Sequence, residues 1–237
     1  MLDFTADGMR SYIEIRNPAT TDVAATFIVT TQLTDSVNRQ ALPFDTARNV
    51  DAQDCYIELP DYAQPRSLSI GPVNNRVTLA QLDGLIPDVA EGSAMISGRR
   101  QTSIESDDVD ESNWLRKDVE LMFLPFTKMS LAAGAPHGPP VFTTKAGQRA
   151  GWAVMESRTL VYSQPKLGDL LSYFNADLAL EEKSRLSRRW AFNTTSGELL
   201  GISDTVGLCI DLDARRAIAW PSELRELIEQ HMQPQLA

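Results

Sequence analysis

The clearest periodicity in the chain is an apolar stripe over residues 114–133. Its apolar residues recur at intervals of three or four positions: Leu115, Val119, Met122, Phe126 and Met129. This spacing predicts an amphipathic helix that begins near Asn113 and stops at Gly134. Pro125 lies within the stripe and lacks a backbone donor, so we expect the helix to kink there.

From residue 151 onward the pattern becomes that of strands. The predicted strands cover residues 152–162, 170–180, 187–194, 199–212 and 216–220. Polar and glycine residues at 194–198 and 211–215 are typical of hairpin turns. An antiparallel sheet can bury the apolar side of a single helix laid across one of its faces. The sequence therefore predicts an α+β fold.

The segment at residues 106–114, called here the acidic segment, is the strongest candidate for chemistry. It places four acidic side chains before the predicted helix: Asp107, Asp108, Asp110 and Glu111. A carboxylate can accept a proton from water or attack a carbonyl carbon, and N–H groups at a helix start can hold the developing oxyanion. The structural alternative is that Asp110 or Ser112 is an N-cap and that the acidic residues complement the helix dipole.

Asp108 to Trp114 resembles the D-x-D-x-x-G-H segment before the central helix of hotdog-fold thioesterases in the 4-hydroxybenzoyl-CoA thioesterase group. Residues 158–169, with Pro165, Gly168 and Asp169, are similar to that family's strand and P-x-x-G-D turn. Residues 196–201 resemble its late hairpin, and Trp220 with Pro221 resembles its ending before a terminal helix. The resemblance covers about residues 96–230.

This resemblance implies a hotdog fold, in which an antiparallel sheet wraps around a central helix. It implies hydrolysis of acyl-CoA or acyl-carrier-protein thioesters, with water attacking at the N-terminus of that helix. The catalytic carboxylate would be Asp110, or Asp108 if the register slips. No cofactor is expected beyond coenzyme A as part of the substrate. Asn113 and Trp114 replace the motif's glycine and histidine, so a catalytically inactive acyl-CoA-binding or regulatory protein is the alternative.

Four further residues are candidates for substrate binding. Asn113 could hydrogen-bond a substrate carbonyl or water, and Trp114 either lines the site or belongs to the core. Glu120 falls on the polar face of the predicted helix, where the alternative is a solvated side chain. His137 lies in a proline-rich loop after the helix, at a pocket rim or simply exposed. The chain's histidines and cysteines lack the paired spacing of metal ligands, so no metal is expected.

The first part of the chain resembles a degenerate copy of the second. Residues 10–22 parallel residues 157–169, with a proline and an aspartate at the same spacing. The only helical candidate in the first part is short, residues 78–85. We therefore expect a double hotdog: a unit at residues 1–85 without the long helix, a linker at 86–95 and a complete domain at 96–237. The alternative is that the early strands extend one large sheet.

Charge bears on partners and location. The net charge of −10 argues against a nucleic-acid partner or an anionic membrane surface. No segment approaches the roughly 20 apolar residues of a membrane span, and a soluble, cytoplasmic protein is expected. Hotdog units usually pair edge to edge, so a homo-oligomer is expected too. Two local groups of basic residues could hold the phosphates of coenzyme A: Arg99 with Arg100, and Arg185 with Arg188 and Arg189.

Overall fold

The computed structural model describes the chain except residues 6–7, 36, 38–41, 44–55, 71–72, 74–76, 89–97, 117–118, 126 and 129–140. The chain divides into two compact units, Met1–Arg66 and Ser67–Ala237. In the part of the chain described, no helix is both long and apolar enough to cross a bilayer.

The first unit contains a three-stranded antiparallel sheet. Its strands are β1 (Asp3–Thr5), β2 (Gly8–Arg16) and β3 (Val23–Thr31), in the order β1-β2-β3, followed by a 3-10 turn, η2 (Asp61–Ala63). One carboxylate ties this unit together, because Glu14 accepts hydrogen bonds from Tyr12 and Tyr62 and pairs with Arg16. The short connection between β2 and β3 makes them a hairpin.

The strand order of this unit differs from that of the second unit. β2 and β3 pair directly, whereas the strands in the corresponding sequence of the second unit, β6 and β7, are separated by two others. The parallel between residues 10–22 and 157–169 therefore does not extend to the pairing of strands. The division after Arg66 also differs from the expected boundary at residue 85. The reason is that the helix at residues 79–85 packs on the second sheet through Leu82.

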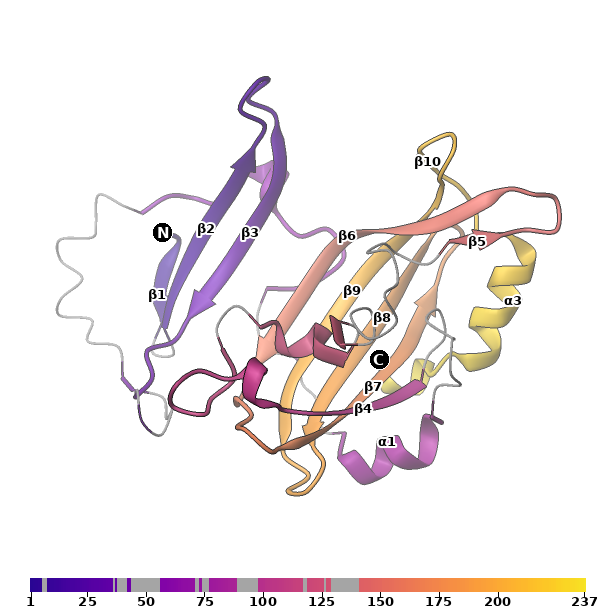
Figure 1. Cartoon of the computed structure of the whole chain (residues 1–237). Coiled ribbons are helices and arrows are strands. Elements are labelled where there is room, and N and C mark those ends of the chain that lie inside the picture. The colour runs from indigo at the N-terminus through magenta and orange to yellow at the C-terminus, as the bar shows by residue number, and fades with distance from the viewer. Residues whose placement is uncertain are drawn as a thin grey trace. The chain divides into compact units, whose positions relative to one another are not determined.

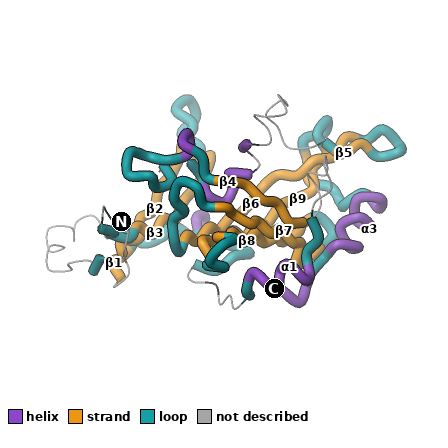
Figure 2. Tube along the Cα trace, turned by 60° about the horizontal axis from the view of Figure 1, so that its bottom comes forward, coloured by secondary structure: helices purple, strands orange, loops and turns teal. Residues whose placement is uncertain are grey.

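The second unit is built on a seven-stranded antiparallel sheet (Figures 1 and 2). Its order is β4-β7-β8-β9-β6-β5, with β10 paired to β9. The strands are β4 (Gly98–Ser103), β5 (Phe142–Thr143), β6 (Arg149–Val161), β7 (Leu170–Leu180), β8 (Ser184–Asn193), β9 (Leu199–Asp211) and β10 (Arg216–Ala217). Four of the five predicted strands correspond to β6, β7, β8 and β9, because apolar alternation and turn residues fix them locally. Of the fifth, predicted at residues 216–220, only Arg216–Ala217 is a strand.

Helical elements cover both faces of this sheet. They are α1 (Leu79–Leu85), η3 (Ser106–Asp108), η4 (Leu121–Phe123), α3 (Ser222–His231) and η5 (Pro234–Leu236). On one face, Leu121, Met122 and Leu124 pack against Leu171 and Tyr173 of β7. Leu82 of α1 and Leu236 of η5 pack on the other face, and α3 covers a third cluster around Trp220. The unit is thus an α+β domain of hotdog type, in which a sheet packs around a helical segment, as predicted.

The predicted helix begins later than expected. Asn113 has a positive φ of 63°, and Trp114 forms a β-bridge with Lys166. Neither conformation is helical, so the described helical residues start at Leu121 and continue through 124–125 and 127–128. The remainder of the predicted helix, from residue 129, lies outside the described residues. The kink at Pro125 stays a prediction.

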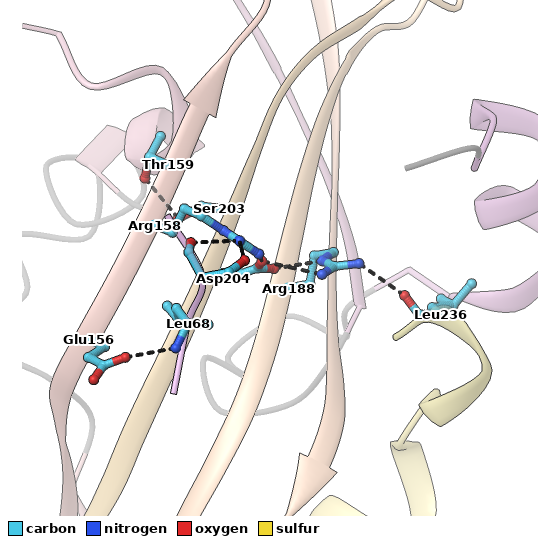
Figure 3. A network of polar contacts seen from close by, with 9 residues as sticks. Leu68, Glu156, Arg158, Thr159, Arg188, Ser203, Asp204 and Leu236 are labelled. Atoms are coloured by element: carbon cyan, nitrogen blue, oxygen red, sulfur yellow. Dashed lines mark hydrogen bonds and ion pairs between the residues drawn. The ribbon is translucent and has the colours of Figure 1, made fainter. Parts of the chain in front are cut away.

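One buried polar network spans three strands on the α1 face (Figure 3). Asp204 of β9 pairs with Arg188 of β8 and with Arg158 of β6. Arg188 also donates to the carbonyl oxygen of Leu236, 3.2 Å away, and Arg158 donates to Ser69 Oγ at 2.8 Å. The network therefore holds the C-terminal turn and the start of the second unit against the same face of the sheet.

Candidate functional site

Backbone hydrogen bonds hold the acidic segment against the P-x-x-G-D turn, residues 165–169. The amide of Leu115 donates to the carbonyl oxygen of Pro165 at 3.1 Å, and the amide of Leu167 donates to that of Asn113 at 3.0 Å. This turn also leads directly into β7, which begins at Leu170. The two sequence motifs that carried the family resemblance thus form one local structure.

Asp108 anchors the acidic segment to the helical segment. It ends the 3-10 turn η3, and its Oδ2 accepts the amide hydrogen of Glu105 at 2.8 Å. Lys128 Nζ lies 2.6 Å from the same oxygen and also donates to the carbonyl oxygen of Ser103 at 2.8 Å. Only 12% of the Asp108 side chain is exposed. Its carboxylate therefore has both a cation and a backbone donor as partners.

Asp110 organises the next turn. Its Oδ1 accepts hydrogen bonds from the backbone amides of Ser112 at 2.9 Å and Trp114 at 3.2 Å. Its own amide donates to the carbonyl oxygen of Trp114 at 2.8 Å. Asp110 thus caps this turn. It does not cap the helix, which is what the N-cap alternative supposed. The bonds fix the orientation of the carboxylate, while the residue stays half-buried.

Asn113, at the position of the motif's glycine, adopts a backbone conformation that glycine adopts readily. Its φ of 63° lies in the left-handed region, where asparagine is enriched among residues other than glycine. Asparagine at this position is therefore compatible with the left-handed turn. The side chain of Asn113 is exposed, and its predicted contact with substrate stays a prediction.

Trp114 belongs to the core and also supports a cation. Only 7% of the residue is exposed. Lys166 Nζ lies 4.1 Å from the centroid of the indole ring, and Lys166 itself is exposed. The alternative that placed Trp114 in the core is confirmed, although one face of its ring contacts a charged group beside the acidic segment.

The start of the helical segment is held by Tyr173, which sequence analysis did not identify, and by Arg189, which it considered only as a phosphate ligand. Tyr173 Oη donates to the carbonyl oxygen of Leu121 at 2.8 Å, and Arg189 Nη1 donates to that of Met122 at 2.8 Å. Burial raises the pKa of the Tyr173 hydroxyl above its usual value. Burial also lowers the pKa of the Arg189 guanidinium to about 10, which leaves it cationic at neutral pH. The alternation of side chains along β7 and β8 could have placed Tyr173 and Arg189 on the same face of the sheet. It could not have predicted that they bond to the carbonyl oxygens of Leu121 and Met122.

The other predicted site residues have different outcomes. Glu120 is exposed and precedes the first helical residue, Leu121, so it does not lie on the polar face of a helix that starts at residue 114. Its carboxylate raises the pKa of Arg189, partly opposing the effect of burial. His137 lies outside the described residues. Among the residues that the structure describes, no group of three or more His, Cys, Asp or Glu side chains could hold a metal.

The arginines predicted as possible phosphate ligands mostly contact other side chains of the protein. Arg99, Arg185 and Arg188 each engage other side chains of the second unit. Their partners are Asp83 for Arg99, the rings of Trp152 and Trp220 for Arg185, and Asp204 for Arg188. A guanidinium in such contacts would lose them on turning toward a ligand. The structure therefore does not favour these residues for phosphate binding.

Comparisons with known proteins give matches among solved structures only. No family model matches the chain, and no curated protein matches it. A probable thioesterase from Escherichia coli, YbaW, is 19% identical, with a TM-score of 0.43 over 57% of this chain and 98% of that protein. A 1,4-dihydroxy-2-naphthoyl-CoA thioesterase from Synechocystis is 12% identical, with a TM-score of 0.42 over 56% of this chain and 95% of that one.

A third similar structure is the 12:0-ACP thioesterase from Umbellularia californica. It is 15% identical, with a TM-score of 0.44 over 58% of this chain and 51% of that one. Likeness of this extent concerns the course of the backbone and not the chemistry of a site. The assignment of the second unit to the hotdog type therefore rests on its own strand order and on the helical segment packed against its sheet.

Proposed function

We propose that the second unit hydrolyses thioesters whose acyl group is carried by coenzyme A or by a carrier protein. The observation that carries this proposal is the geometry of Asp110. One of its oxygens is fixed by the amides of Ser112 and Trp114, in a turn that Asn113 completes with a positive φ. A half-buried carboxylate held in this way is oriented before any substrate arrives, which is what a general base or nucleophile requires.

The reaction needs few parts. A carboxylate that accepts a proton from water lets the water oxygen attack the thioester carbonyl carbon. The tetrahedral intermediate then collapses, the carbon–sulfur bond breaks, and the departing sulfur takes up the proton. In the nucleophilic variant, Asp110 attacks first and displaces the thiolate, which takes up a proton. Water then cleaves the resulting anhydride into the free acid and the Asp110 carboxylate. Either route uses the same carboxylate and needs no cofactor beyond the carrier in the substrate.

Asp108 has a positioning role in this proposal. Its bonds to Lys128 and to the amide of Glu105 fix the loop from which Asp110 projects. Because Asp108 is nearly buried and paired with a cation, it is less suited than Asp110 to reach a thioester. The burial and pairing of Asp108 support Asp110 as the reacting carboxylate in this proposal.

A non-catalytic acyl-binding protein is the second candidate function. The observation that favours it is that both carboxylates already serve the fold, Asp108 through Lys128 and Asp110 through two amides. If those structural roles are complete in themselves, the site would bind a thioester without cleaving it. The predicted homo-oligomer and cytoplasmic location stay predictions under either function.

Thiol release from short, aromatic and long acyl-CoAs tests the proposal. Asp110→Asn keeps an oxygen that can accept the two amide hydrogens but removes the basic group, so turnover should fall by about 100-fold or more. Asp107→Asn is the matched control, because Asp107 is exposed on the same loop, and it should keep the wild-type rate. If no thioester is cleaved but acyl-CoA raises the melting temperature, the binding function is favoured instead.

A further inference from the structure

A single exposed lysine occupies an unusual position beside the proposed site. Lys166 forms a β-bridge with Trp114, and its ammonium lies 4.1 Å from the centroid of the Trp114 ring. The amide of Trp114 is in turn bonded to Asp110 Oδ1. The cation and the proposed catalytic carboxylate therefore contact the same residue.

The position of Lys166 is fixed more firmly than that of an ordinary surface lysine. Its amide donates to Asp169 Oδ2 at 2.8 Å, and the amide of the next residue, Leu167, donates to the carbonyl oxygen of Asn113. A cation over an indole face gains further stabilisation even at an exposed site. Less rotamer freedom remains to be lost when the ammonium meets an anion, which lowers the entropic cost of binding.

The negative charge around the proposed site would repel an anionic substrate. Asp107, Asp110 and Glu111 crowd the acidic segment, in a chain whose net charge is −10. A thioester on coenzyme A or on a carrier protein brings the phosphate of its 4′-phosphopantetheine arm. Like charges repel, although salt screens the effect beyond about 8–10 Å. An ammonium held on Trp114, the residue whose amide is bonded to Asp110, reduces the negative potential that the phosphate meets.

Other basic side chains are less available for this task. Arg185 stacks on Trp152, with its guanidinium carbon 4.8 Å from the ring centroid, and Arg188 is paired with Asp204. Lys128, the cation nearest Asp108, is bound to it at 2.6 Å. Lys166 combines exposure with a fixed position in the turn that holds Asp110.

We propose that Lys166, held on the ring of Trp114, binds the phosphate of the 4′-phosphopantetheine arm that carries the acyl group. This inference rests on the proposed thioesterase function and adds a residue that recognises the carrier. The phosphate is common to coenzyme A and to carrier proteins, so the contact serves both. It also explains how a strongly acidic protein can admit a substrate with an anionic arm.

A series of substrates with one acyl group isolates the phosphate. Wild type and Lys166→Met are compared on acyl-pantetheine, which lacks the phosphate, on acyl-4′-phosphopantetheine, on acyl-CoA and on an acylated carrier protein. An exposed ion pair predicts that kcat/KM falls about two- to fivefold for the three phosphorylated substrates. Acyl-pantetheine should show no such fall. The difference should shrink as ionic strength rises, and Lys166→Arg should retain most of the wild-type preference.

Lys183→Met is the matched control, because Lys183 is exposed in the turn after β7, away from the acidic segment. It should match wild type on every substrate. An equal fall for acyl-pantetheine and acyl-4′-phosphopantetheine would overturn the phosphate contact while leaving thioesterase activity intact. A fall confined to acyl-CoA would place the contact on the nucleotide, and a fall confined to the carrier protein would place it on the protein surface. Either result would also overturn the proposal.

If the proposed thioesterase function is wrong, the substrate series gives a different result. In that case wild type cleaves none of the four substrates. Calorimetric binding of acyl-pantetheine and acyl-4′-phosphopantetheine to the wild-type protein and to Lys166→Met then tests the contact alone. The proposal predicts that Lys166→Met weakens binding of the phosphorylated compound by about two- to fivefold. Unchanged binding of both compounds would contradict it.

Discussion

Replacing Asp204 should destabilise the second unit more than replacing Asp107, Asp110 or Asp213. Asp204 exposes 1% of its surface, and it is the shared partner of Arg158 and Arg188 (Figure 3). Arg188 Nε lies 2.6 Å from Oδ1, and Arg188 Nη2 lies 3.3 Å from Oδ2. Asp204→Asn keeps the volume but leaves two largely buried guanidinium groups without their counter-charge.

Breaking a buried ion pair by removing one partner typically costs about 3–5 kcal/mol. The pairs of Asp204 belong in that class, because the exposed fractions of the Arg158 and Arg188 side chains are only 16% and 9%. Replacing all three residues by apolar ones of similar size should recover much of the loss, since no charge then remains buried. The C-terminal turn should also loosen, because Arg188 binds the carbonyl oxygen of Leu236.

Urea unfolding at neutral pH, followed by tryptophan fluorescence, measures the effect. Trp190 is buried, and the guanidinium carbon of Arg188 lies 5.9 Å from its ring centroid. With a slope of about 2 kcal/mol per molar urea, the midpoint should fall by about 1.5–2.5 M. The control is Asp213→Asn, which breaks an exposed pair with Arg149 and should cost less than about 1 kcal/mol. An Asp204→Asn loss as small as that of the control would refute the reasoning.

Three further predictions concern the backbone, packing and a buried thiol. Asn113→Gly should leave the melting temperature unchanged or slightly raised, whereas Asn113→Ala should cost about 1 kcal/mol, because alanine is strained at a φ of 63°. Gly201→Ala should destabilise by about 1–3 kcal/mol in urea unfolding, because its Cβ would lie 2.9 Å from the carbonyl oxygen of Leu160 and 3.0 Å from Met122 Sδ. Burial raises the pKa of the Cys209 thiol to about 11. In a background without the other cysteine, the alkylation rate of the folded protein should therefore rise toward pH 11. Since the unfolded thiol ionises first, this thiol should also lower the free energy of unfolding as pH increases from about 9 to 11; a stability that rose over that range would contradict the shift.

The strands of the second unit could be predicted because their signals are local. β7 matches its predicted bounds, Leu170–Leu180, since a run of apolar residues lies between turn residues on both sides. The P-x-x-G-D turn and the late hairpin were likewise evident from proline, glycine and aspartate at fixed spacing. Such features depend on residues close in sequence, where conformational preferences are strongest.

The helix start could not be predicted from the same kind of pattern. Trp114 and Leu115 fit the apolar stripe of a helix, yet they bond instead to the turn around Pro165, about fifty residues later. The apolar periodicity begins several residues before the helical residues do, which start at Leu121. Over those earlier residues, tertiary hydrogen bonds and the left-handed conformation of Asn113 determine the backbone conformation. The acidic segment therefore forms its own turn before the helix.

The roles of the basic residues were also beyond the sequence. Arg188 and Arg189 are neighbours in β8, so they point to opposite faces of the sheet. Arg188 meets Asp204 on one face, and Arg189 meets the carbonyl oxygen of Met122 on the other. A basic pair that looks like one anion site in sequence is thus two separate structural contacts. Lys166 is an isolated lysine in the sequence, and only the fold places its ammonium over the ring of Trp114.

The most direct test of the central claim compares thiol release by wild type, Asp110→Asn and Asp107→Asn on the best acyl-CoA substrate. All three proteins are first shown to unfold at the same urea concentration. We expect wild type and Asp107→Asn to cleave at equal rates and Asp110→Asn to be slower by about 100-fold or more. Equal rates for all three would contradict the role of Asp110, and no cleavage by wild type would contradict thioesterase activity itself.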